Sequence, residues 1–151
     1  FKVESLDPAA PQISFAMRPD LIGHYQHGRL HGGVIATVLD TVGGLAVTVA
    51  IAEKFNGETA EQVGHRFGRI GTIDLRVDYL RPADPADLIA VGEVRLLGNR
   101  VGNATVQIFS ASNPEVVIAE GRGVYNIRKA GAKAPDIVHA KAQTPTCEEA
   151  P

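Results

Sequence analysis

Cysteine is almost absent from this sequence of 151 residues, which contains one, Cys147. A single cysteine cannot form an internal disulfide, and this fits a reducing compartment. Residues 1–20 also lack the basic, apolar and small-residue order of a secretory signal peptide. We therefore expect a cytoplasmic protein.

Net charge is also scarce, because 15 Lys and Arg stand against 17 Asp and Glu. A nearly neutral chain has no overall positive field to hold a polyanion, which argues against nucleic-acid binding. Any anionic ligand must be met by a local group of Lys and Arg. The length predicts one domain, which we place at residues 1–128. The remainder, 129–151, is rich in Ala, Pro, Lys and Thr and is expected to be a disordered tail.

One long hydrophobic run is present, since residues 32–52 contain a single ionisable side chain, Asp40. The run is just long enough to span a bilayer. However, an Asp near its middle costs about 2.5–3.5 kcal/mol there, and the rest of the chain reads as amphipathic strands that need an apolar partner. We therefore expect no membrane span. The run predicts a helix over 31–55, with apolar residues on every side and hence covered all round.

Strand patterns lie on both sides of this helix. In 72–80 the side chains alternate, with Ile73, Leu75, Val77 and Tyr79 on one face. The predicted strands are 12–18, 72–80, 87–97, 102–111 and 115–127. Residues 19–30 predict an irregular loop.

The polar segment 56–70 carries a short helix signal, because Thr59 followed by Gln62 fits a capping box. An amphipathic sheet with one long helix can bury its apolar face only by curling around that helix. The expected fold class is therefore α+β, with a curved antiparallel sheet wrapped around one long central helix.

Asp40 is the unusual residue of the helix, because no Lys, Arg or His lies within two turns of it there. A carboxylate in apolar surroundings is costly unless it is hydrogen-bonded. Asp40 could bridge to a neighbouring backbone, face an interface groove or act in catalysis. His31, Gly32 and Gly33 stand at the helix start, where free backbone N–H groups attract negative charge. Glycine lets a ligand approach that backbone, so this start is a candidate oxyanion site.

Gly32 and Asp40 are eight positions apart, so they lie about 12 Å apart along a helix axis. One substrate carbonyl cannot contact both from the same chain. If both act on one substrate, they come from two subunits, and a symmetric dimer has two such sites. Gly43 and Gly44 would suit close approach across that interface.

The segment 30–40, LHGGVIATVLD, resembles the PaaI-type family of hotdog-fold acyl-CoA thioesterases, in which HGG precedes an acidic residue eight positions after the first glycine. The stretch 71–82, GTIDLRVDYLRP, is similar to that family's next strand. With the extra segment before it, the resemblance is closest to the YigI-like branch, which acts on medium- and long-chain acyl-CoA. It implies a hotdog fold, homodimers that often pair into tetramers, and hydrolysis of acyl-CoA to free acid and CoA.

The resemblance also implies roles for single residues. The backbone N–H of Gly32 would bind the thioester carbonyl, and Asp40 would be general base or nucleophile. Thr72 would help to hold the water or the carboxylate, while His31 and Gly33 would shape the substrate-binding loop at the helix start. This chain departs from the pattern seven residues before Gly32. Relatives often have Asn or Gln there, and here Tyr25 stands with Gln26 and His24 as possible substitutes.

The CoA phosphates require local positive charge, for which Arg100 and Arg122 are candidates. Others are His65, Arg66, Arg128 and Lys129. No cofactor is expected, since CoA is part of the substrate. His24, His27 and His31 are spaced suggestively for a metal, but no carboxylate or cysteine joins them, so we expect no metal site. Alternatives are a non-catalytic acyl-CoA-binding module and a thioesterase for aromatic acyl-CoA. A hydratase fits poorly, because His31 and Asp40 are too far apart.

Overall fold

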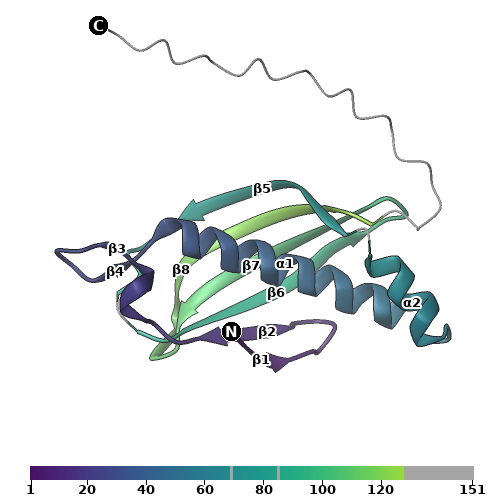
Figure 1. The fold of residues 1–151 in the computed structure, drawn as a ribbon, viewed down its shortest axis with the longest axis horizontal. Coiled ribbons are helices and arrows are strands. Elements are labelled where there is room, and N and C mark those ends of the chain that lie inside the picture. Colours follow the sequence, from purple (N-terminus) through teal and green to yellow (C-terminus); the bar gives the residue numbers. More distant parts are fainter. Residues whose placement is uncertain (69, 85, 128–151) are drawn as a thin grey trace, which may run out of the picture.

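A curved antiparallel sheet wraps around one long helix, α1 (Gly32–Lys54), in the computed structural model (Figure 1). The structure describes residues 1–68, 70–84 and 86–127, so the predicted tail at 129–151 lies outside them. The sheet has six strands in the order β1-β2-β6-β7-β8-β5. Its strands are β1 (Lys2–Ser5), β2 (Gln12–Phe15), β5 (Gly71–Tyr79), β6 (Leu88–Leu97), β7 (Val101–Ser110) and β8 (Asn113–Asn126). The expected α+β arrangement is confirmed.

The five strands predicted from alternation are all present, with ends within a few residues of the predicted ones. β1 was not predicted, because its sequence KVES is mostly exposed and carries little alternation. It pairs with β2 at one edge of the sheet, and β5 forms the other edge through its pairing with β8.

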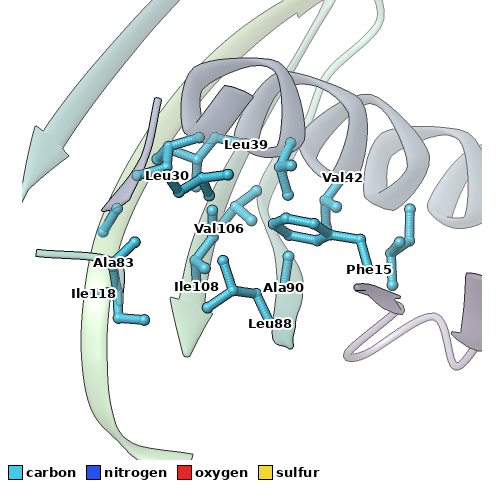
Figure 2. Close-up of a cluster of buried hydrophobic side chains, with 14 residues drawn as sticks. Phe15, Leu30, Leu39, Val42, Ala83, Leu88, Ala90, Val106, Ile108 and Ile118 are labelled. Carbon is cyan, nitrogen blue, oxygen red and sulfur yellow. The ribbon is translucent and has the colours of Figure 1, made fainter. Parts of the chain in front are cut away.

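One face of α1 packs on the concave side of the sheet and forms the core with β6, β7 and β8 (Figure 2). Val38, Leu39 and Val42 are fully buried there. The backbone of β8 comes so close that a Cβ at Gly121 would lie 3.0 Å from the Cβ of Leu39. Close approach of this kind requires glycine on the strand.

The opposite face of α1 stays partly open, so the prediction of a helix covered all round is wrong for a single chain. Thr37 and Thr41 are exposed on this face, and Asp40, Gly44 and Thr48 are only partly buried. By length and composition α1 could cross a membrane. Its packing on the sheet instead makes it the core helix of this domain.

The segment before α1 is more ordered than predicted. It contains the 3₁₀ turn η1 (Pro19–Leu21) and a small hairpin of β3 (Ile22–His24) and β4 (Arg29–Leu30). Gly28 makes the tight turn possible with a φ of 61°, a value that glycine adopts without strain. At the other end of α1, the helix α2 (Ala60–Phe67) begins with the predicted capping box of Thr59 and Gln62.

A β-bulge near the start of β5 changes which side chains face α1. Thr72 pairs with Tyr125 and Asp74 pairs with Val124, so Ile73 is an extra residue without a partner. The bulge places Thr72 on the same face as Leu75. In a regular strand these two residues, three positions apart, would face opposite sides. Ile73 was predicted on the apolar face, and this was wrong, since it is 60% exposed.

Leu39→Ala should lower the free energy of unfolding by about 2–5 kcal/mol, because it leaves a cavity between α1 and β8. Leu96→Ala is the matched control, since Leu96 is 55% exposed and should change stability by no more than about 0.5 kcal/mol. Chemical denaturation at one protein concentration measures both. Equal midpoints for Leu39→Ala and the unsubstituted protein would contradict this packing.

Candidate active site

Asp40 lies on the open face of α1 and is held by Thr72, whose Oγ1 donates a 2.7 Å hydrogen bond to Asp40 Oδ1. The β-bulge in β5 brings this hydroxyl to the helix side of the sheet. No Lys, Arg or His of the described chain forms an ion pair with Asp40. Thr72, for which the resemblance implied a contact with either the water or the carboxylate, thus contacts the carboxylate. The charge of Asp40 has a hydroxyl rather than a cation as its neighbour.

Tyr125 also contacts Asp40, through a hydrogen bond of 3.1 Å from its hydroxyl to the backbone carbonyl of Asp40. The ring lies between β8 and α1 and is 2% exposed. A Cβ at Gly43 would clash with the Tyr125 hydroxyl, whereas one at Gly44 would make an ordinary 3.7 Å contact. We expected Gly43 to serve a contact between subunits, but its lack of a side chain is needed within the single chain.

Burial raises the pKa of the Tyr125 phenol well above its ordinary value, and the negative charge of Asp40 raises it further. Tyr125 therefore keeps its proton at physiological pH. A neutral phenol next to a carboxylate remains a hydrogen-bond donor, which is the role seen here.

The start of α1 is shaped by two side chains. His31 caps the helix, since its Nδ1 accepts a 2.8 Å hydrogen bond from the Gly33 N–H. Tyr79 on β5 donates a 2.9 Å hydrogen bond to the Gly32 carbonyl. At the first position of the helix, the Gly32 N–H has no carbonyl four residues back within the helix to bond. Within the described chain it is the N–H at this end that stays available to a ligand.

A cavity of about 380 Å³ opens at this helix start and is lined by Gly32, Tyr79 and His24. Arg29 and Arg81 line it too, and sequence reasoning missed both. Arg29 forms a long ion pair of 3.7 Å with Asp84, and Arg81 donates to the Val117 carbonyl at 2.6 Å. The available signal was their position, three residues before Gly32 and at the end of the strand 72–80.

The other predicted ligand residues lie farther from this cavity. Tyr25 is 90% exposed at the tip of the β3–β4 hairpin, and neither Tyr25 nor Gln26 lines the cavity. Arg122 lies on the sheet face opposite α1, since side chains alternate along β8, and it lines a separate cavity of about 520 Å³. Arg100 is exposed in the turn before β7.

His65 and Arg66 lie on α2, beyond the carboxyl end of α1, and Arg66 is paired with Glu58. Arg128 and Lys129 fall outside the described residues. His24 and His27 stack with ring centroids 4.9 Å apart. Among the described residues, no group of three or more His, Cys, Asp or Glu could hold a metal ion.

The two ends of the site are separated on one rigid element. Gly32 and Asp40 both belong to α1, so about 12 Å of helix lies between them. Asp40 does not line the cavity at the helix start. A free N–H donor and a hydrogen-bonded carboxylate are the groups that acyl transfer needs, one for the oxyanion and one for the nucleophile. A single chain presents them at two places.

The family model described as the thioesterase superfamily matches residues 27–117, which include Gly32, Asp40 and Thr72. The chain belongs to the thioesterase superfamily. A relative from Salmonella typhimurium, named medium/long-chain acyl-CoA thioesterase YigI, is 32% identical over 126 residues, which cover 83% of this chain and 80% of the relative. The YigI of Escherichia coli K12 is 31% identical over the same shares.

A crystal structure from Shewanella oneidensis, described as related to the thioesterase superfamily, superposes with a TM-score of 0.77 at 36% identity. The match covers 83% of this chain and 80% of that one. A thioesterase-family crystal structure from Syntrophus aciditrophicus gives a TM-score of 0.69 at 29% identity, over 83% of this chain and 82% of that one. The hotdog fold and the thioesterase family expected from the sequence are both confirmed.

Stability should fall as pH rises above about 10, the ordinary pKa of tyrosine. Because the pKa of Tyr125 is raised in the folded state, the native protein binds this proton more tightly than the unfolded chain, and this stabilisation is lost at higher pH. Tyr125→Phe should show a shallower fall. Denaturation midpoints measured from about pH 9 to 11 test it, with Tyr25→Phe as the control for an exposed phenol. Parallel curves for Tyr125→Phe and the unsubstituted protein would refute it.

Proposed function

We propose that this protein hydrolyses the thioester of medium- to long-chain acyl-CoA, with Asp40 as its catalytic carboxylate. The observation that carries the proposal is the hydrogen bond from Thr72 on β5 to Asp40, a carboxylate in the middle of the largely apolar helix α1. Among the described residues, Asp40 has this hydroxyl donor and no cation as an ion-pair partner. The free N–H of Gly32 supplies the second requirement. The chain-length class is supported by the names of the YigI relatives.

In this reaction the Gly32 N–H and the positive end of the α1 dipole stabilise the oxyanion that forms on the thioester carbonyl. Asp40 takes a proton from a water that attacks the carbonyl carbon, or it attacks that carbon itself and gives a mixed anhydride that water then opens. The C–S bond breaks in either route, and CoA leaves as a thiol with the acid as the other product. Thr72 holds one carboxylate oxygen throughout. No cofactor takes part.

The proposed enzyme is a homodimer, because β5 is an edge strand that pairs with β8 on one side, has no partner strand on the other among the described residues, and exposes apolar side chains. Ile73 is 60% exposed, Tyr79 54% and Leu80, just after the strand, 49%. An edge of this kind is a template for another strand. A second copy of β5, antiparallel to the first, would continue the sheet across a twofold axis.

This pairing would complete the site, because β5 contacts both halves of it. Thr72, near the start of β5, is bonded to Asp40, and Tyr79, at its end, is bonded to Gly32. With a twofold axis near the middle of the strand, the Thr72 end of one strand lies beside the Tyr79 end of the other. Asp40 of one subunit would then face the partner's Gly32.

The open face of α1 suits such an approach. Thr37, Thr41 and Thr48 each donate their hydroxyl to a carbonyl four residues earlier in the helix, so they present methyl groups outward. With Gly44 they form a stripe of small residues beside Asp40. Helices with small side chains can approach closely, and a partner there would exclude water from the carboxylate.

Positive charge for the CoA phosphates is best placed at Arg29 and Arg81, which line the cavity at Gly32. Arg100 and Arg122 remain candidates for binding the nucleotide part of CoA if it extends to another part of the assembly. Gly33, Tyr25 and Gln26 remain candidates for binding the pantetheine part near the hairpin. A dimer of dimers would bring further surfaces to the nucleotide.

Asp40→Asn and Asp40→Ala should lower turnover at least about a hundredfold, the lower bound for loss of a general base. Thiol release from octanoyl-CoA, palmitoyl-CoA and phenylacetyl-CoA measures it. Asp74→Asn is the matched control, since Asp74 lies on β5 two residues after Thr72 but lines the cavity on the face of the sheet opposite α1. Unchanged circular dichroism and elution volume establish that the variants remain folded.

Three outcomes would contradict the proposal. Binding of acyl-CoA without thiol release by the unsubstituted protein would indicate a binding module. Faster release from phenylacetyl-CoA than from either fatty acyl-CoA would indicate an aromatic substrate. Equal turnover in Asp40→Asn and Asp74→Asn would remove Asp40 from the chemistry.

A further inference from the structure

Tyr125 is a buried polar side chain that the proposed reaction does not use. Its hydroxyl donates to the Asp40 carbonyl at 3.1 Å. Burial, and after it the negative charge of Asp40, raises the pKa of this phenol, so it stays a donor. The Asp40 carbonyl is also in position to accept the N–H four residues later in the helix. The phenol is therefore an additional donor, aimed from the sheet at the backbone of the catalytic residue.

Two glycines on different elements make room for this hydroxyl. A Cβ at Gly43 on α1 or at Gly123 on β8 would clash with the Tyr125 phenol. Gly43 lies within a helix interior, where glycine costs about 1 kcal/mol relative to alanine. This cost is explained if the path of the tyrosine to Asp40 has to stay open.

Tyr125 and Thr72 are direct neighbours across the β5–β8 ladder. The bulge after Thr72 turns its side chain to the same face as Tyr125, so both hydroxyls point at Asp40 from adjacent strands. Thr72 holds the carboxylate and Tyr125 holds the main chain of that residue. Two contacts, one on each part of Asp40, define where its free carboxylate oxygen points.

We propose that Tyr125 is a positioning residue that fixes the catalytic turn of α1 against the sheet and, together with Thr72, sets the aim of the Asp40 carboxylate. The inference rests on the proposed thioesterase function. Tyr125 touches no substrate in this arrangement, so it acts through Asp40 on the rate and leaves substrate binding unchanged.

Tyr125→Phe tests this, because it keeps the ring and removes only the hydroxyl. For octanoyl-CoA, kcat should fall about three- to tenfold, the effect of losing one hydrogen bond. KM should stay within about twofold, since no group that contacts the substrate is removed. In the Asp40→Asn background, the same change should alter the residual rate by less than about twofold, because the residue that Tyr125 positions is already inactive.

Val47→Ala is the matched control for stability. Val47 is fully buried in the same apolar cluster as Tyr125 and contributes no hydrogen-bonding side chain. It should lower Tm and leave kcat unchanged when assayed well below that Tm. This control distinguishes the effect of lost core packing from the effect of lost positioning of Asp40.

Each result decides the matter. A kcat for Tyr125→Phe equal to that of the unsubstituted protein would overturn the inference while leaving the thioesterase function intact. An equal fold-loss of rate with Asp40 present and in the Asp40→Asn background would also overturn it, because the tyrosine would then act through the fold. Absence of thiol release by the unsubstituted protein is a separate result that removes the proposed function and the role of Tyr125 with it.

Discussion

A rigid helix keeps Gly32 and Asp40 about 12 Å apart, and the rest of the structure is organised around that constraint. An oxyanion donor and a carboxylate that act on one carbonyl have to lie within a few ångströms of it. One copy of α1 supplies both groups but cannot bring them together. The proposed solution is a second copy, so that each subunit contributes one group to each of two sites. The site is then a property of the interface.

The sheet holds both groups in place. β5 contributes Thr72 to the Asp40 carboxylate and Tyr79 to the Gly32 carbonyl. These contacts tie the two functional positions of the helix to the strand at the free edge, where a partner would add. A shift of β5 would therefore move both groups at once.

The sequence predicted the long helix with the HGG segment at its start and five of the six strands of the large sheet, because apolar periodicity and the HGG segment are local signals. It did not predict the bulge at Ile73. The bulge changes which side chains of β5 face α1, and it depends on the pairing of β5 with β8. The role of Tyr125 was also hidden, because its partner lies 85 positions away. Arg29 and Arg81 line the same cavity only in the folded chain, because one comes from the β3–β4 hairpin and the other follows β5.

Subunit mixing tests the shared site most directly. Gly32→Pro removes the N–H where proline suits a helix start, and His31 before it is already extended, with ψ at 133°. Homodimers of Gly32→Pro and of Asp40→Asn should both be inactive. An equal mixture, dissociated and reassociated, should regain about a quarter of the unsubstituted activity, since half the dimers are mixed and each has one intact site. If the site lies within one chain, the mixture stays inactive.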